Sequence, residues 1–329
     1  MRPRPSALPS MARRLQYGVS IVEVMIALTL GLVAVGGAAA IYLANRRSFT
    51  TVENVGRLEE NARFAIDLLS RDIREAGNSV CGGALIPTNI VTTPNDWALW
   101  DRALVGDVFA SSTAPSAIAS PTSGSRQLSN TDSLLVWSAS AAGSPFQITS
   151  HSLVTNSITT SENTNYHAND VVVACDGSQL LTFEVASTPP ANVLTYLDPG
   201  ARSPQLNAGG YLIPLTAHIW YVGKSATTGG YSLRRLTIDK TGAWGSNNDE
   251  MVTGVTGLQI QYLLADASGL PSSMTYQDSS AIGNQWTLVT AVRLTLTLST
   301  LDAAGSTGSA STVITHDVPM TVNIKVRVP

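Results

Sequence analysis

Cysteine and charged residues are scarce in this chain. It has 329 residues, two of them cysteines (Cys81 and Cys175), with 13% charged residues and a formal net charge of -3. The cysteines lie far apart and form no C-x-x-C pair, which excludes the usual redox and zinc motifs. A chain that is not basic offers no default reason to expect nucleic acid as a partner. The length suffices for one large domain.

Charge and proline are both absent from Val24 to Ala44, and proline is absent from residue 10 to residue 86. The charge-free run is long enough to span a bilayer as a helix. Upstream, residues 1–18 contain arginines and no acid, which favours the cytoplasmic side for that end. The sequence therefore predicts a membrane span, with the remaining chain on the other side.

One acid, Glu23, lies at the start of this run, where a charge is costly and needs a function. A peptidase cut after Gly18 would leave Val19 as the amino terminus, four residues before Glu23. On a helix this spacing puts both groups on one face, and the acid can also reach the amine of a neighbouring chain. Two alternatives stay open: a signal peptide cut near residues 38–40, and an uncleaved single-pass anchor.

The segment Gln16–Glu23 resembles the leader and cleavage junction of type IV prepilins, with a glycine before the cut and an acid at the fifth mature position. The resemblance implies that a prepilin peptidase cuts between Gly18 and Val19 and methylates Val19. The family usually has phenylalanine at the position of Val19. Met11 would give a leader of typical length, so Met11 is an alternative start to Met1.

The helix is expected to continue beyond the membrane run. Apolar or small residues recur at three- and four-residue spacing while charges occupy the other face. This stripe comprises Val52, Val55, Leu58, Ala62, Ala65, Leu69, Ile73 and Ala76. Gly77 supplies a helix stop. The pattern predicts one helix from about Ser20 to Ala76, on the order of 85 Å long.

From Asn78 onward the pattern changes to strands. Period-two alternation or short apolar runs predict strands at 134–137, 171–173, 181–186, 217–222, 231–238, 258–262, 292–299 and 320–328. Polar stretches at 110–131 and 302–312 are interpreted as loops. No boundary divides the head. The order predicts an α+β fold, with a long N-terminal helix packed on an antiparallel β-sheet head domain.

A second resemblance lies after the membrane run. Residues 61–65, 71–77 and 81–83 resemble the PilW family of minor pilins, and residues 255–262 and 291–294 resemble its later strands. Residues 14–83 carry most of the likeness. It implies a rare, non-catalytic subunit that takes part in type IV pilus assembly, in an initiation or tip complex, and so in cell adhesion or twitching motility.

The same resemblance implies partners and a location. The expected partners are prepilin peptidase, other minor and major pilins, the inner-membrane assembly platform and a tip adhesin. The chain would comprise a leader (1–18), a transmembrane and filament-core helix (19–44), its amphipathic continuation (45–77) and a β-rich head (78–329). The head would be periplasmic while the chain is held in the bacterial inner membrane, and the protein would enter the pilus on assembly. A minor pseudopilin of type II secretion and an anchored periplasmic binding or enzyme domain are the alternatives.

Both cysteines follow the membrane run, so the predicted topology puts them in an oxidising compartment. A disulfide between Cys81 and Cys175 would contribute roughly 4 to 5 kcal/mol in the chain-entropy model. The alternative is a pair of buried free thiols.

No pattern predicts catalysis, a metal or a cofactor. The histidines at 151, 167, 218 and 316 form no H-E-x-x-H motif. Gly223–Ser225 is interpreted as a hairpin turn rather than a phosphate loop, and Asn247–Glu250 as a solvated turn without EF-hand spacing. Arg234 and Arg235 lack the aromatic and basic surroundings of a nucleic-acid site.

Overall fold

The structure is a computed structural model. It describes residues 18–81, 87–91, 104–106, 128, 130–139, 145–198, 200, 202–225, 230–238, 244–265, 275–301 and 307–319. The chain divides into two compact units, residues 1–54 and residues 55–329, which we describe separately. The predicted strand at 320–328 lies outside the described residues, as does most of the predicted loop at 110–131.

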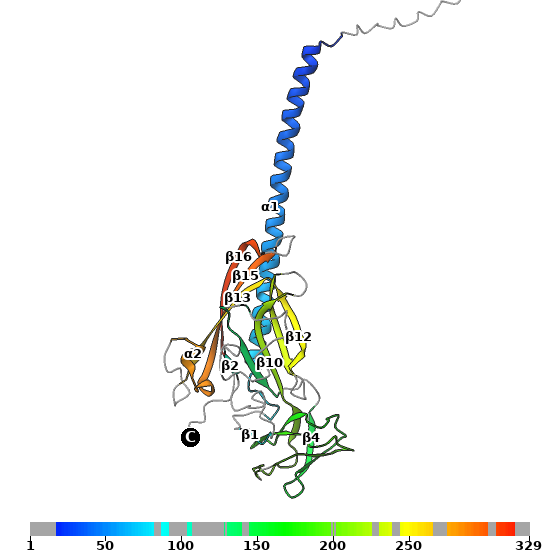
Figure 1. The fold of residues 1–329 in the computed structure, drawn as a ribbon, viewed down its shortest axis with the longest axis vertical. Coiled ribbons are helices and arrows are strands. Elements are labelled where there is room, and N and C mark those ends of the chain that lie inside the picture. The colour runs from blue at the N-terminus through cyan, green and yellow to red at the C-terminus, as the bar shows by residue number, and fades with distance from the viewer. Residues whose placement is uncertain are drawn as a thin grey trace, which may run out of the picture. The chain divides into compact units, whose positions relative to one another are not determined.

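A single helix, α1, runs from Ile21 to Glu75 (Figure 1). Its bounds agree with the predicted helix to within one residue at each end. It ends because Gly77 adopts a φ of 68°, a left-handed conformation that glycine tolerates best. The Gly77 N–H then donates to the carbonyl of Trp137 at 2.7 Å, which joins the helix end to the first long strand of the head.

The head is built largely of strands, together with a short helix, α2 (Ser279–Ile282), and a 3-10 turn, η2 (Trp286–Leu288). The strands are β1 (Pro87–Asn89), β2 (Leu104–Gly106), β3 (Leu134–Ser138), β4 (Phe146–Ser152), β5 (Ser157–Thr160), β6 (Val171–Cys175), β7 (Leu180–Glu184), β8 (Val193–Thr195), β9 (Tyr211–Pro214), β10 (Thr216–Lys224), β11 (Tyr231–Ile238), β12 (Trp244–Thr253), β13 (Val255–Leu264), β14 (Gln277–Asp278), β15 (Val289–Leu301) and β16 (Thr307–Pro319). A helix followed by mostly antiparallel strands confirms the α+β class.

These strands form three sheets. Their strand orders are β1-β7-β6-β9-β4-β5-β8, β12-β11-β10-β3-β2 and β14-β13-β15-β16. Described pairs are antiparallel except β1 with β7 and the isolated bridge between Ser79 and Ala139.

One hydrophobic core joins α1 to the second and third sheets. The helix contributes Leu58, Ala62, Ala65, Leu69, Ile73 and Ala76, which pack with residues of β3, β10, β13 and β15. The predicted stripe was therefore right from Leu58 onward. Val52 and Val55, at the start of the stripe, are exposed in the single chain.

The sheet that contains β3 and β10 is buried on both faces. On β3, Leu134 and Val136 belong to the core beneath α1, whereas Leu135 and Trp137 belong to a second core. Alternate residues of a strand point to opposite faces, so this sheet lies between two apolar layers. The two-sided burial explains why 134–137 is a continuous apolar run.

The second core joins this sheet to a lobe formed by residues 145–214, which we call the barrel lobe (Figure 1, strands around β4). The lobe is inserted between β3 and β10, whose ends pair directly at Ser138 and Thr216. A bridge between Val185 and Tyr196 connects the edge strand β8 to the end of β7. The strands from β7 to β8 therefore form a closed barrel. A third core fills its interior, around Phe183 and Tyr196.

Two sequence interpretations were wrong. Residues 307–312, taken as loop, are the first half of β16, which pairs with β15. Residues 247–250, taken as a turn, lie within β12 and pair with β11. In both places polar residues form strands because a neighbouring strand supplies the hydrogen bonds, and local composition does not reveal that neighbour.

Candidate functional site

The predicted processing junction lies at the start of α1. Gly18, Val19 and Ser20 precede the helix, all three are exposed, and the Val24 N–H donates to the Ser20 carbonyl at 3.1 Å. Glu23 occupies the first turn of the helix. A carboxylate there interacts favourably with the positive end of the helix dipole. The peptide bond between Gly18 and Val19 is therefore exposed in the single chain, and Glu23 lies about one helical turn after Val19.

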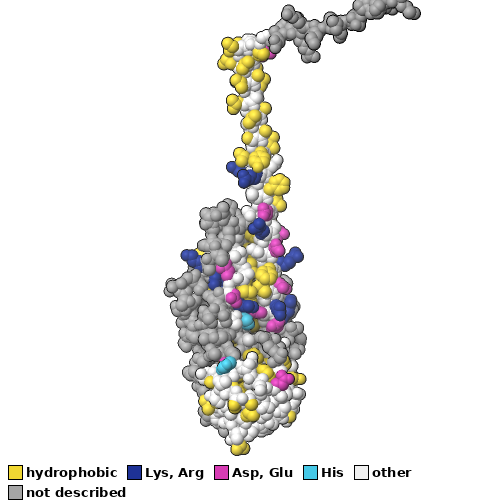
Figure 2. All heavy atoms as spheres, turned by 90° about the vertical axis from the view of Figure 1, so that its right-hand side faces the viewer, with side chains coloured by type: hydrophobic (Ala, Val, Ile, Leu, Met, Phe, Trp, Pro, Cys, Tyr) yellow, Lys and Arg dark blue, Asp and Glu magenta, His cyan; other side chains and the backbone are white. Residues whose placement is uncertain are grey.

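The helix after the junction exposes an unusual amount of apolar surface. Every residue from 18 to 50 is exposed, and the large apolar side chains among them extend from Val19 to Phe49. Figure 2 shows this segment as mainly yellow. Among the described residues, α1 is the one helix long and apolar enough to cross a membrane. A signal sequence would meet the same criteria of length and composition, so the surface indicates burial in lipid or protein without distinguishing between them.

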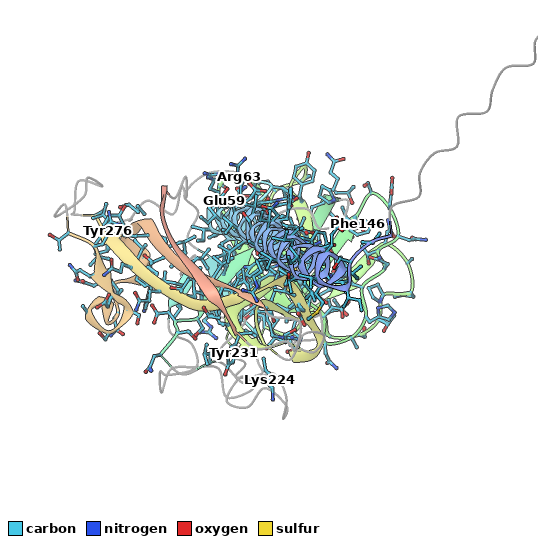
Figure 3. All side chains as sticks on the ribbon, turned by 90° about the horizontal axis from the view of Figure 1, so that it is seen from above. Glu59, Arg63, Phe146, Lys224, Tyr231 and Tyr276 are labelled. Carbon is cyan, nitrogen blue, oxygen red and sulfur yellow. A yellow bond between two sulfur atoms is a disulfide. The ribbon has the colours of Figure 1, made fainter. Side chains whose placement is uncertain are left out.

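In the second unit, the outward face of α1 is charged. Glu59 and Arg63 lie on it (Figure 3), and Arg71 Nε is 3.3 Å from Glu75 Oε1. Exposed pairs of this kind contribute little to stability. Phe64 is 49% exposed within this charged surface. The face is mixed in sign and carries one half-exposed aromatic side chain.

A polar contact fastens the other face of α1 to the head. The indole Nε1–H of Trp220 donates to Asp72 Oδ2 at 2.8 Å, and the Arg235 guanidinium lies 5.7 Å from the Trp220 ring centre. Burial lowers the pKa of neighbouring His218, and nearby Asp72 partly opposes this effect. The sequence pattern placed the charged residues of this helix, Asp72 among them, on the face opposite the apolar stripe. No signal in the sequence pairs it with a tryptophan 148 residues away.

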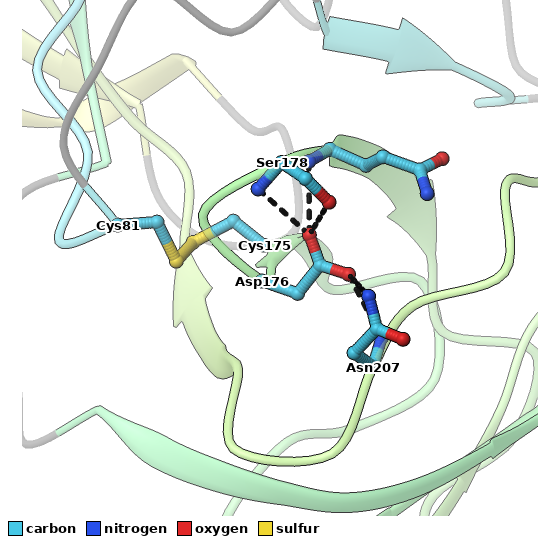
Figure 4. Close-up of a disulfide and its surroundings, with 6 residues drawn as sticks. Cys81, Cys175, Asp176, Ser178 and Asn207 are labelled. Carbon is cyan, nitrogen blue, oxygen red and sulfur yellow. Dashed lines mark hydrogen bonds between the residues drawn. A yellow bond between two sulfur atoms is a disulfide. The ribbon is translucent and has the colours of Figure 1, made fainter.

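The two cysteines are brought together, and the predicted disulfide between Cys81 and Cys175 is present (Figure 4). Cys81 follows the end of α1, and Cys175 is the last residue of β6 in the barrel lobe. Their Cα atoms are 6.0 Å apart, across a sequence separation of 94. The bond links the end of the helix covalently to the lobe.

The residue after Cys175 is held by several hydrogen bonds (Figure 4). Asp176 Oδ1 accepts from the Ser178 N–H and hydroxyl and from the Gln179 N–H, and Oδ2 accepts from the N–H and side-chain amide of Asn207. Partial burial alone would raise the pKa of Asp176. Hydrogen bonds from Asn207, Ser178 and Gln179 outweigh it and lower the pKa to about 2. The carboxylate orders the turn beside the disulfide.

The histidines whose side chains are described contact neighbouring residues of the fold. His151 Nδ1 accepts from the Leu206 N–H at 3.0 Å, so its Nε2–H faces the Tyr196 hydroxyl at 2.7 Å, and burial lowers its pKa. His167 Nδ1 lies 4.0 Å from Asp170. His316 is in β16, and its side chain is outside the described residues. Within the described part of the chain, no cluster of three or more His, Cys, Asp or Glu side chains could hold a metal ion.

The remaining motifs belong to strands. Lys224 pairs with Tyr231, and the Ser225 N–H donates to the Gly230 carbonyl at 2.8 Å, as expected for a hairpin at 223–225. Arg234 is buried, and its Nη1 lies 3.5 Å from Glu250 Oε2. Neither arrangement forms a phosphate or nucleic-acid site.

A family model described as "Type IV Pilus-assembly protein W" (PilW) matches residues 219–326. The resemblance to the PilW family is thereby confirmed. The match begins within β10 and includes β11, β12, β13, β15 and β16. It contains the two strand motifs at 255–262 and 291–294 but not residues 14–83, where we expected most of the likeness. No curated protein and no solved structure matches the chain. The PilW match indicates a role in type IV pilus assembly, together with other pilus components.

Proposed function

We propose that the chain is a minor pilin. Prepilin peptidase would cut it after Gly18 and methylate Val19. Residues 19–44 would hold the mature chain in the inner membrane until it enters a pilus, where the same residues would form part of the filament core. The helix segment 45–77 and the head (78–329) would enter the pilus with them. The observation that carries the proposal is the combination of the exposed apolar helix with the PilW match. Apolar surface of this extent needs lipid or sister helices around it.

Glu23 would act in assembly. A carboxylate within an apolar helix bundle is costly unless a cation compensates it. The amine of an adjacent subunit at Val19 is such a cation, because cleavage after Gly18 creates it about one helical turn before Glu23. Glu23 would thereby set the register of one subunit against the next as the subunit leaves the membrane. The contact is heterologous and can propagate along a filament.

The expected partners are prepilin peptidase, other minor and major pilins, the inner-membrane assembly platform and a tip adhesin, in an initiation or tip complex. The proposed role is non-catalytic, which agrees with the PilW match. A minor pseudopilin of type II secretion would share the helix and its processing. Deletion of the gene separates the two roles, because the pilus role predicts loss of surface pili or twitching whereas the secretion role predicts loss of exoprotein release.

The amino-terminal sequence and mass of the mature protein, purified from its native membrane, test the proposal directly. We expect a methylated chain that begins at Val19. A chain that begins at Met1 or Met11, or one cut after residue 40, would contradict prepilin processing and favour the anchored-domain alternative.

The role of Glu23 has its own test. The Glu23→Ala variant should insert and be cleaved normally, yet its amount in sheared pili should fall about tenfold or more, because the amine of the neighbour loses its counter-charge. Glu59→Ala removes an exposed acid from the same helix and serves as the matched control. Equal amounts of both variants in the pili would refute the assembly role of Glu23.

A further inference from the structure

The barrel lobe is additional to the core that holds α1 against the sheets. That core contains no residue of 145–214, and the strands on either side of the insertion pair with each other at Ser138 and Thr216. The Thr216 hydroxyl also donates to the Ser138 carbonyl at 2.9 Å. The lobe is thus an insertion that covers one face of the sheet through the second core, and its remaining surface is free to carry a function of its own.

Three aliphatic side chains are exposed together at one end of this lobe, and we call them the apolar tip. Leu153 and Val154 lie in the β4–β5 turn and are 42% and 95% exposed, and Leu197 lies just after β8 and is 55% exposed. The segments are neighbours because β5 pairs with both β4 and β8, and the Tyr196 N–H donates to the Asn156 carbonyl at 3.0 Å. A single exposed aliphatic residue needs no explanation, but a cluster in turns, where polar residues prevail, does.

The turn that presents the tip is ordered by its own polar groups. The Thr155 hydroxyl lies 2.9 Å from Ser152 Oγ and 2.8 Å from Ser157 Oγ. Asn156 has a φ of 47°, which asparagine tolerates better than most residues. Leu153 and Val154 are therefore held outward by a turn that is already formed, which lowers the entropy cost of binding.

Described residues after Leu197 are held by hydrogen bonds as well. Asp198 accepts hydrogen bonds from the backbone N–H groups of Arg202 and Ser203 at 2.9 and 2.7 Å. Further along, the Leu206 N–H donates to His151 Nδ1, which ties this segment back to β4. The apolar tip thus has rigid supports on both of its segments.

The charge of the lobe restricts the partner. Residues 145–214 contain five acidic residues (Glu162, Asp170, Asp176, Glu184 and Asp198) and a single basic residue, Arg202. Asp170 is buried, and the other four acids are exposed or half-buried. Asp198 directly follows Leu197. An anionic lipid surface would be repelled by this lobe, and a second copy would bring the same acids together. On the face that Figure 2 shows, the charged side chains visible on the lower lobe are acidic.

We propose that the apolar tip docks into another protein chain, one with an apolar recess rimmed by lysine or arginine. Leu153, Val154 and Leu197 would fill the recess, and Asp198 would face the basic rim. An apolar core surrounded by a polar rim is the usual anatomy of such contacts. This contact goes beyond the filament role of α1 and does not depend on how the amino terminus is processed.

Photocrosslinking in the native cells tests the proposal with the full-length chain. The probe is p-benzoylphenylalanine, placed at Val154 in one strain and at Val193 in another, and products are identified by mass spectrometry. Val193 is the control, because it is an exposed valine of β8 that pairs with Thr159, farther from the β4–β5 turn than Leu197. We expect one discrete product with a different protein chain from position 154, and at least about tenfold less of it from position 193.

The tip itself is tested in the strain that carries the probe at Val154. Leu153→Ser with Leu197→Ser should lower the yield of that product about tenfold, and Asp198→Lys should lower it at low salt more than at high salt. The thermal midpoint should be unchanged in the serine variant, and the disulfide should be intact in both variants, which shows that the lobe is folded. A product with lipid or with a second copy alone, equal yields at 154 and 193, or a yield unaffected by the serine variants would overturn the proposal. Membrane localisation and the mass of the amino-terminal peptide, measured on the same samples, report on the pilin role independently.

Discussion

The two halves of α1 share one helical backbone and differ in what surrounds them. From residue 18 to residue 50 every side chain is exposed, whereas Leu58, Ala62, Ala65, Leu69, Ile73 and Ala76 are buried against two sheets. Helical propensity is adequate in both halves, so it does not decide their roles. The distribution of apolar residues does: an all-round apolar surface needs a membrane or a bundle, and a stripe needs one packed face. The following predictions test this contrast, from the largest expected effect to the smallest.

The disulfide should matter most, because the buried half ends beside it. Replacement of both cysteines by serine should lower the free energy of unfolding of the head by roughly 4 to 5 kcal/mol in the chain-entropy model. Chemical denaturation of the detergent-solubilised protein, with and without the replacement, measures the loss. The same value for both proteins would mean that the lobe is held without the bond.

Truncation within the two halves gives the sharpest comparison. Leu69→Ala should cost about 2 to 5 kcal/mol of unfolding free energy because it leaves a cavity between α1 and the sheets. Leu32→Ala removes the same atoms from a side chain that is 74% exposed. It should change head stability by less than about 0.5 kcal/mol. Equal losses, measured by thermal unfolding, would break the distinction between the halves.

The polar fastening of the buried half should have a smaller effect. Asp72→Ala leaves the Trp220 Nε1–H without its acceptor and should cost about 1 to 3 kcal/mol. Asp67→Ala, an exposed acid on the same helix, is the control and should be nearly neutral. Tryptophan fluorescence during chemical denaturation measures the free energy of unfolding of both variants. An unchanged free energy of unfolding in the Asp72 variant would show that water replaces the carboxylate as the hydrogen-bond acceptor at no cost.

Acid should weaken the turn beside the disulfide. The pKa of Asp176 is about 2 in the folded protein and lies below its ordinary unfolded value near 3.9. Its contribution is therefore complete above pH 5 and is lost as the pH falls from about 4 towards 2. Because the group is largely exposed, we expect only about 1 kcal/mol. Asp176→Asn should remove this part of the acid sensitivity, and an unchanged pH profile of unfolding would contradict the assignment.

The exposed ion pair of the helix should matter least. Arg71→Ala breaks the contact with Glu75, and we expect a loss of at most about 0.5 kcal/mol, which rises slightly at low salt. Denaturation at two salt concentrations measures it. A loss above 1 kcal/mol would mean that this face of α1 is held more firmly than its exposure indicates.

Much of the secondary structure could be predicted from the sequence. The bounds of α1 follow from the absence of proline, the apolar pattern and Gly77, and strands such as β13 and β15 follow from period-two alternation. The strands β4, β5 and β8 of the barrel lobe were not predicted. β5 and β8 are short, all three contain serine or threonine, and their place in the lobe depends on distant contacts such as the Val185–Tyr196 bridge.

The candidate site shows the same division. Gly18, Val19 and Glu23 could be singled out because their spacing is local, and the disulfide could be expected because the chain has two cysteines. The Asp72–Trp220 contact and the apolar tip could not be, because each joins segments that meet only after folding. Val154 taken alone in the sequence looks like an ordinary core residue.

By itself, the sequence determined where α1 begins and ends, which of its residues form an apolar stripe, and that strands follow it. Those features depend on backbone preference and on side-chain periodicity, which act over a few residues. Only the tertiary structure decided that the stripe starts to be buried at Leu58, that β3 is covered on both faces, and that Leu153, Val154 and Leu197 meet at one end of an inserted lobe. Those features depend on which distant segments exclude water from one another, because burial is a property of the packed chain as a whole.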